Sequence, residues 1–180
     1  MAEDTDNDRR RMLTTVTTGV GLAGAGALAV PFVASMMPSA RAKAAGAPVE
    51  ADISKLPEGQ MLTVEWRGKP VFIIRRTAQM IKDLPGIREK LADPDSEVKT
   101  QQPVYAKNEY RSIKPDILVV LGVCTHLGCA PTKKFEQGKA SGVSDDWVGG
   151  FFCPCHGSAF DLAGRVYRSV PAPTNLEVPP

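Results

Sequence analysis

The sequence predicts a mainly β protein, an antiparallel β-sandwich with a small subdomain, preceded by one N-terminal transmembrane helix. Three observations lead to this prediction. Residues 12–40 contain no charged side chain. Residues 61–66 and 71–76 are β-rich runs around a glycine-containing turn, and residues 117–123 and 147–152 are two further apolar runs. Long uncharged segments are typical of membrane helices, and short β-rich runs between turn residues are typical of antiparallel strands.

The size and charge of the chain limit what it can be. Its 180 residues, 43% of them hydrophobic, suffice for one globular domain plus a short additional segment. The 22 basic and 20 acidic residues give a formal net charge of +2. A chain so close to neutrality lacks the broad positive field that draws proteins onto nucleic acid, and we therefore expect no nucleic-acid partner.

The N-terminus has the features of an export signal that stays in the membrane. Residues 1–11 are polar, and residues 9–13, Arg-Arg-Arg-Met-Leu, fit the twin-arginine pattern that directs folded cofactor proteins to export. Residues 12–38 are long enough to span a bilayer and are predicted to form a signal-anchor helix. Two alternatives remain, namely a cleaved signal with a small-residue site at residues 40–42, and a buried helix of a soluble protein.

The orientation of this helix follows from the same pattern. Charge counting is ambiguous, because three arginines precede the helix and Arg41 and Lys43 follow it. The twin-arginine pattern places residues 1–11 in the cytoplasm and the rest on the far, oxidising side. We thus expect a single-pass protein of the bacterial inner membrane with its main domain, residues 49–180, on the periplasmic side. Residues 39–48 are small and basic and are predicted to form a flexible hinge, although an ordinary connection would have the same composition.

Residues 49–180 have the pattern of a β domain. The two β-rich runs on either side of residues 67–70 are predicted to form a hairpin. Residues 77–98 contain good helix formers interrupted by two prolines, which predicts short helical pieces joined by loops. Residues 132–146 are polar and are expected to form a solvated connection.

All the cysteine and histidine residues of the chain lie in two short motifs. The four Cys and two His fall between residues 124 and 156. They form the hexapeptides Cys-Thr-His-Leu-Gly-Cys, residues 124–129, and Cys-Pro-Cys-His-Gly-Ser, residues 153–158, within loops predicted at about 122–131 and 151–160. Each motif follows an apolar run, so each loop is placed at the end of a strand. Such clustering indicates one shared metal site.

The pair of motifs suits an iron–sulfur cluster with mixed ligands. Cysteine thiolates are the usual ligands of such clusters, and replacing two thiolates on one iron by neutral imidazoles removes negative charge and raises the reduction potential. Each loop can provide one sulfur and one nitrogen. Cys124 and Cys153 would then bind one iron, while His126 and His156 bind the other.

This allocation leaves Cys129 and Cys155 without iron. They lie one in each loop, on the side of the membrane predicted to be oxidising, where a disulfide persists. We therefore predict a Cys129–Cys155 bridge that ties the two loops together. A tetrahedral zinc site is the competing chemistry, because two Cys and two His also form a zinc ligand set. Structural zinc sites favour adjacent like ligands, however, whereas here each loop offers one of each kind.

The two hexapeptides closely resemble those of the Rieske subunit of the cytochrome bc1 complex, bacterial type. The likeness extends to the anchor and hinge, to residues 68–73, Gly-Lys-Pro-Val-Phe-Ile, and to residues 170–176, Val-Pro-Ala-Pro-Thr-Asn-Leu. The resemblance implies a Rieske-type fold and one [2Fe–2S] cluster with the ligands Cys124, His126, Cys153 and His156. It also implies that Ser158 donates a hydrogen bond to a cluster sulfur and that residues 170–173 form a third, proline-rich loop over the cluster.

The same resemblance implies a function and partners. The implied function is that of an electron-transfer subunit of the enzyme quinol–cytochrome c oxidoreductase. His156, as the catalytic residue, would meet quinol in a pocket of cytochrome b and accept a proton while the cluster accepts an electron. The domain would then move on residues 39–48 to deliver the electron to cytochrome c1. The implied partners are cytochrome b, cytochrome c1, quinol and membrane lipid, in a dimeric multi-subunit complex.

Two features depart from the family pattern. Phe160 stands where many members carry a tyrosine whose hydroxyl bonds a cysteine sulfur. Without that donor the reduced cluster is less stabilised, which predicts a lower reduction potential than in the tyrosine-bearing members. The sequence stops at residue 180, where family members usually continue into another strand, which leaves open whether the native chain ends there.

Two other functions compete with this one. A Rieske subunit of an exported molybdenum oxidase, such as an arsenite-oxidising enzyme, would receive its electrons from a molybdenum centre. The anchor, the hinge and the proline-rich loop favour the bc1 complex instead. A soluble ferredoxin of an aromatic-ring dioxygenase would need neither the anchor nor the two additional cysteines.

Overall fold

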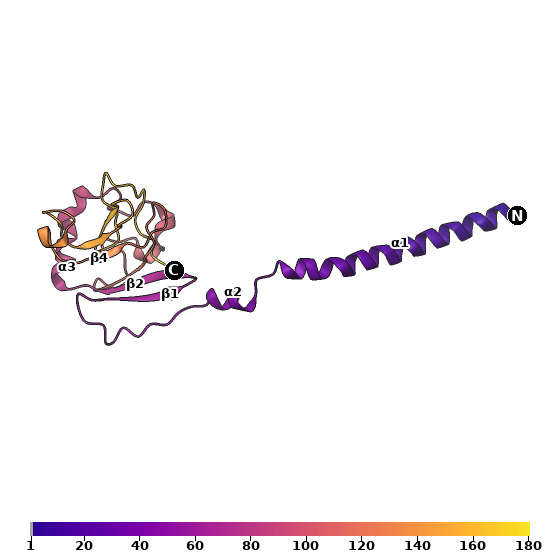
Figure 1. Cartoon of the computed structure of the whole chain (residues 1–180), viewed down its shortest axis with the longest axis horizontal. Coiled ribbons are helices and arrows are strands. Elements are labelled where there is room, and N and C mark those ends of the chain that lie inside the picture. The colour runs from indigo at the N-terminus through magenta and orange to yellow at the C-terminus, as the bar shows by residue number, and fades with distance from the viewer. Residues whose placement is uncertain (1) are drawn as a thin grey trace. The chain divides into compact units, whose positions relative to one another are not determined.

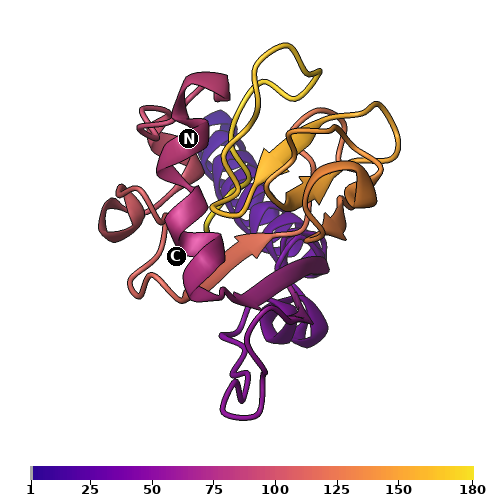
Figure 2. The same ribbon diagram turned by 90° about the vertical axis from the view of Figure 1, so that its left-hand side faces the viewer.

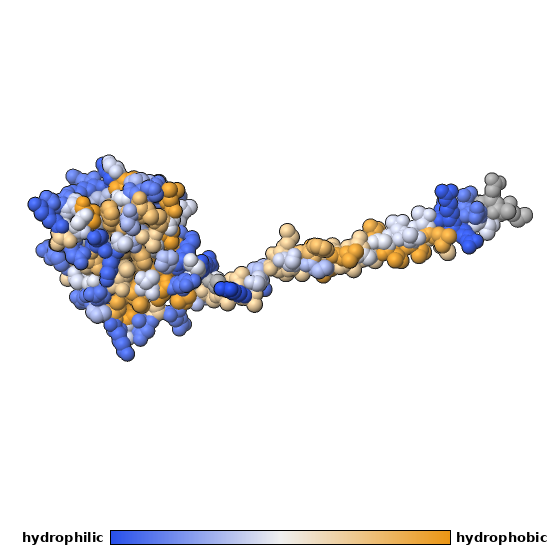
Figure 3. Space-filling view, in the orientation of Figure 1, coloured by the Kyte–Doolittle hydropathy of each residue, from blue (hydrophilic) through white to orange (hydrophobic). Residues whose placement is uncertain are grey.

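The computed structural model describes residues 2–180, and its contacts divide the chain into two units, Met1–Gly46 and Ala47–Pro180. The first unit begins with helix α1, Ala2–Ser35 (Figure 1). The 31 residues Thr5–Ser35 are long and apolar enough to cross a membrane, since a helix of this length measures about 46 Å. Apolar side chains lie along this helix and hydrophilic ones gather near its N-terminal end (Figure 3).

The segment predicted as a flexible hinge contains a short helix, α2, Ala40–Ala45. Ser39 caps this helix, because its hydroxyl accepts a hydrogen bond from the backbone N–H of Ala42 at 3.1 Å. Four of the six helical residues are alanine, which has the highest helix propensity. An isolated helix of this length is marginal in water, so the segment combines local order with little resistance to unfolding.

The first sheet contains three antiparallel strands in the order β1-β2-β3. The strands are β1, Met61–Trp66, β2, Lys69–Arg75, and β3, Ile117–Leu121. The predicted β1–β2 hairpin is present with a shorter turn than expected. Only Arg67 and Gly68 form the turn, both with positive φ, as two-residue hairpin turns require. Pro70 consequently lies within β2, opposite Glu65.

The second sheet has the order β4-β5-β6, again antiparallel. Its strands are β4, Thr132–Lys134, β5, Gly150–Phe152, and β6, Ala159–Asp161. The expectation that residues 132–146 form only a solvated connection is wrong at its beginning. Thr132 pairs with Phe152, and its hydroxyl donates a hydrogen bond to the Phe152 carbonyl at 3.0 Å. Figure 2 shows this sheet, in orange, beside the first one.

Short helices fill much of the long connection between β2 and β3, as the sequence predicts for residues 77–98. Thr77 caps the first of them, since its hydroxyl accepts the N–H of Met80 at 3.2 Å. A further short helix lies between β4 and β5. The helices are α3, Ala78–Asp83, η1, Pro85–Lys90, η2, Lys99–Gln101, η3, Val104–Ala106, and η4, Gly138–Ser141.

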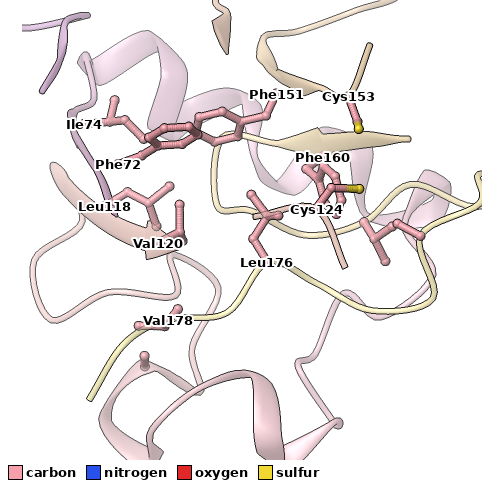
Figure 4. Close-up of a cluster of buried hydrophobic side chains, with 13 residues drawn as sticks. Phe72, Ile74, Leu118, Val120, Cys124, Phe151, Cys153, Phe160, Leu176 and Val178 are labelled. Carbon is pink, nitrogen blue, oxygen red and sulfur yellow. The ribbon is translucent and has the colours of Figure 1, made fainter. Parts of the chain in front are cut away.

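The main core lies between the two sheets. Alternate residues of β2 point to opposite faces, so Phe72 and Ile74 pack in this core, whereas Val71 and Ile73 pack on the other face of the first sheet. The rings of Phe72 and Phe151 stack with centroids 5.7 Å apart and join the sheets. Figure 4 shows Phe72 and Ile74 at one end of this core and two cysteines at the other. The core therefore leads directly to the two loops that carry the cysteine and histidine motifs.

Candidate metal centre

Two loops with identical backbone hydrogen bonds form the centre. Residues 124–129 follow β3, and residues 153–158 connect β5 to β6. In each hexapeptide the N–H of the first residue donates to the carbonyl of the sixth at 2.8 Å, and the N–H of the fifth donates to the carbonyl of the first at 3.0 Å. The fifth residues, Gly128 and Gly157, have φ angles of 83° and 75°, which glycine adopts without strain. The shared glycine thus explains why the two motifs fold alike.

The four predicted ligand residues occupy neighbouring positions in these loops. Cys124 and Cys153 are each 2% exposed and belong to no disulfide. The rings of His126 and His156 lie 4.8 Å apart and nearly perpendicular. His126 is half-buried and His156 is exposed. The site thus has a buried sulfur side and an accessible imidazole side.

The chemistry of these residues fits an iron–sulfur cluster. Burial raises the pKa of the Cys124 thiol, while hydrogen bonds from the His126 backbone N–H and the Ser158 hydroxyl act in the opposite direction. A buried thiolate is therefore costly unless a cation compensates its charge. Two soft sulfurs and two imidazoles are the donor set of the mixed-ligand [2Fe–2S] centre.

A disulfide joins the two loops. It links Cys129 to Cys155, whose Cα atoms are 6.6 Å apart, and this is the pairing that the sequence predicts. The sulfur atoms of both residues lie within 4.8 Å of the Cys153 sulfur. The bridge therefore lies beside the buried sulfur side of the site, where it limits how far the loops can separate.

The predicted third loop, residues 170–173, is hydrogen-bonded to the second loop, and the next residue is bonded to the first. The N–H of Ala172 donates to the Ser158 Oγ at 3.0 Å. The Thr125 hydroxyl donates to the carbonyl of Thr174 at 2.7 Å. The family resemblance implies a proline-rich loop over the site but not these two bonds, because no residue pattern marks a backbone N–H as a partner of a particular hydroxyl.

Three buried arginines, which the sequence does not predict, lie around the end of β6. They hold the turn that follows β6, at residues 161–165. Arg165 pairs with Asp161 through two nitrogens at 2.7 Å, and both side chains are fully buried. Arg111 donates to the carbonyls of residues 163 and 164, and Arg76 to that of residue 162. Burial lowers the pKa of Arg76 and of Arg111 to about 10. The only signal in the sequence is the four-residue spacing of Asp161 and Arg165.

Comparison with family models divides the chain as the structure does. The model described as "Rieske [2Fe-2S] domain" matches residues 47–180. The model described as "Ubiquitinol-cytochrome C reductase Fe-S subunit TAT signal" matches residues 1–39. The fold and the paired loops therefore define a Rieske iron–sulfur protein with an N-terminal membrane anchor that carries a twin-arginine signal.

Two curated relatives agree with this class. The "Ubiquinol-cytochrome c reductase iron-sulfur subunit" of Allochromatium vinosum is 58% identical over 178 residues, which cover 99% of this chain and 85% of the relative. The protein of that name from Blastochloris viridis is 47% identical over 172 residues, 96% of this chain and 86% of the relative. A chain in the solved structure "Hyperthermophilic respiratory Complex III" is 28% identical, with a TM-score of 0.46 and coverages of 91% and 92%.

The chain thus belongs to the family of Rieske iron–sulfur subunits of ubiquinol–cytochrome c reductase, the cytochrome bc1 complex. This membership confirms the predicted fold class, the [2Fe–2S] cofactor and the role in electron transfer. The competing interpretations as a zinc site, a molybdenum-oxidase subunit or a soluble ferredoxin are not supported.

Proposed function

We propose that this subunit takes electrons from quinol at cytochrome b and delivers them to cytochrome c1, and that His156 accepts the quinol proton. One observation carries the proposal. The exposed imidazole of His156 lies 4.8 Å from that of the half-buried His126, on loops that begin with two buried cysteines. A reactant can reach such an imidazole without reaching the sulfurs.

We assign one iron to Cys124 and Cys153 and the other to His126 and His156. When bound, the cluster supplies a carrier for one electron at a potential raised by its two neutral ligands. The protein itself keeps water from the sulfur side, because both cysteines belong to the apolar core together with fully buried Phe160.

His156 would hold the proton on the ring nitrogen that does not bind iron. Imidazole can both accept and release a proton, which is why histidine commonly serves as an acid and a base in catalysis. The three loops are suited to docking into a pocket of a partner protein, because several of their apolar side chains are exposed. These are Leu127, which is 71% exposed, Pro154, Pro171 and Pro173.

The twin-arginine signal and the anchor support a location as well. Residues 1–11 would remain in the cytoplasm, α1 would cross the bacterial inner membrane among lipid, and the domain from Ala47 would lie in the periplasm. An oxidising compartment is also where the Cys129–Cys155 disulfide would persist. Within a dimeric complex, the segment 39–48 would serve as the tether for movement between the two cytochromes.

Ligand variants test the assignment. In the full-length chain, Cys124→Ser, His126→Gln, Cys153→Ser and His156→Gln should each abolish the paramagnetic signal of the reduced cluster and reduce bound iron and labile sulfide. The double variant Cys129→Ser/Cys155→Ser is the matched control, because it removes two cysteines from the same loops and should still bind iron. Retention of the full signal by any of the four ligand variants would contradict the assignment.

The proton and partner roles need separate measurements. Isolation from membranes without stripping partners should yield b- and c-type haem together with the subunit. Because reduction would be coupled to proton uptake, the reduction potential should fall at alkaline pH, approaching about 59 mV per pH unit for one proton and one electron. A potential that is constant from pH 6 to pH 10 would rule out proton coupling at the histidines.

A further inference from the structure

We propose that Ala172 is a positioning residue for the metal centre. Its backbone N–H orients the Ser158 hydroxyl so that the proton of Ser158 points to the sulfur side of the site, and the proline-rich loop thereby raises the reduction potential. The inference rests on the proposed ligand set, since it requires a cluster held beside Cys124.

The hydrogen bond between the loops carries the first step. Ala172 N–H donates to Ser158 Oγ at 3.0 Å, and Ser158 and Ala172 are 0% and 5% exposed. A serine hydroxyl has one proton to donate and two lone pairs that accept. The bond from Ala172 occupies one lone pair, which favours orientations of the hydroxyl that direct its proton away from Ala172.

The second step concerns the direction in which that proton points. The Ser158 carbonyl accepts the N–H of Cys153 at 2.8 Å, which places this buried residue beside the sulfur side of the site. Hydrogen bonding by its hydroxyl lowers the pKa of the Cys124 thiol, against the effect of burial. A proton directed at sulfur stabilises the additional negative charge of a reduced iron–sulfur site and so raises its potential. Removing the N–H of Ala172 would leave the hydroxyl freer to turn, because a hydroxyl rotates to suit its surroundings.

The third step is the stiffness of the segment that presents this N–H. Pro171 and Pro173 flank Ala172 and restrict the backbone on both sides. The Thr125 hydroxyl holds the carbonyl of Thr174 at 2.7 Å. Asn175 is fully buried and accepts the N–H of Val166 at 2.9 Å. The N–H of Ala172 is thus fixed in place before any electron arrives, and orienting the hydroxyl requires little reorganisation.

A purely structural role would also account for the hydrogen bond, because a buried N–H needs an acceptor. The two roles predict different results. A structural bond affects stability alone, whereas an orienting bond affects the reduction potential, and only when Ser158 carries its hydroxyl.

The experiment is a redox titration of the cluster, followed by EPR, in the full-length chain assembled in its complex. Ala172→Pro removes the N–H, and Ala172→Gly keeps it and is the matched control. We expect A172P and Ser158→Ala each to lower the midpoint potential, A172G to lower it less than A172P, and A172P to produce no further decrease in the S158A background. An A172P potential equal to that of A172G, or a full A172P effect in S158A, would overturn the proposal.

A second variant covers the case in which A172P does not assemble. Pro171→Gly loosens the loop at an exposed position and keeps the N–H. It should lower the potential by less than S158A does, and it should cause no further decrease in the S158A background. Unchanged potentials in both P171G and S158A would overturn the inference. A wild-type chain with no reduced-cluster signal would refute the proposed ligand set instead, which separates the two failures.

Discussion

Phe160 is the residue at which the sequence is expected to depart from the family pattern. It lies in β6, two positions after Ser158, and its ring is fully buried in the same core as Cys124 and Cys153. A phenyl ring in this position packs well but offers no hydrogen-bond donor. The His126 backbone N–H and the Ser158 hydroxyl both act as donors to the Cys124 sulfur. The orientation of the Ser158 hydroxyl is therefore important for the potential.

Phe160→Tyr should raise the midpoint potential. A new hydrogen bond of about 0.5–1.5 kcal/mol to a cysteine sulfur, expressed through one electron, corresponds to roughly 20–60 mV. Redox titration with EPR detection measures the change. Phe151→Tyr is the control, because Phe151 is equally buried and lies opposite Phe160 in β5, but its ring packs against Phe72 and Phe135. A potential that does not rise in F160Y would show that the hydroxyl has no effect here.

At the scale of elements, the turn after β6 connects the second loop to the rest of the domain. The carboxylate of Asp161 accepts the N–H groups of Ala163 and Arg165 at 2.9 and 2.7 Å and pairs with the Arg165 guanidinium. The guanidinium also donates to the carbonyl of Leu84 at 3.0 Å. Arg111, which donates to two carbonyls of this turn, also donates to the Gln101 carbonyl and to the Gln102 side-chain oxygen. The position of β6, and with it that of the second loop, thus depends on segments that are distant in sequence.

Asp161→Asn should destabilise the domain severely. The change leaves the fully buried Arg165 without its counter-charge, and breaking a buried pair in this way costs about 3–5 kcal/mol. Denaturant unfolding measures the loss, and iron content after purification shows whether the second loop still holds its metal. Asp145→Asn breaks the exposed Lys139–Asp145 pair and should leave stability unchanged. Equal stability of D161N and D145N would contradict the importance of this turn.

The elements differ in how far the sequence predicts them. The hairpin and the two loops are predictable, because local alternation, turn residues and the metal-ligand motifs lie within short stretches. Strand β4 is not predictable, because Thr132–Lys134 has three polar residues and becomes a strand only by pairing with β5. The buried arginines are missed for a related reason. Most of their partners are carbonyls far away in the sequence, and a charged side chain is ordinarily interpreted as exposed.

At the scale of the whole molecule, the chain consists of an anchor and a cluster-bearing domain, and residues 39–48 are proposed to act as the tether between them. The boundary between the two units falls between Gly46 and Ala47, directly after α2. Because α2 is a six-residue, alanine-rich helix, it can unfold at little cost and lengthen the tether. A helical residue spans about 1.5 Å and an extended one about 3.3 Å, so unfolding α2 would add roughly 11 Å of reach.

Stiffening this tether should slow turnover without changing the metal centre. Replacing Ala42 and Ala44 by proline prevents the segment from forming α2 and restricts its extended form, so the domain would sample fewer positions. Quinol-dependent cytochrome c reduction by the assembled complex should fall several-fold, while the EPR spectrum and midpoint potential remain those of the wild type. Serine at the same two positions is the matched control and should retain most of the turnover, since it leaves the backbone free. If the proline variant reduced cytochrome c as fast as the serine variant, movement on residues 39–48 would not be part of the reaction.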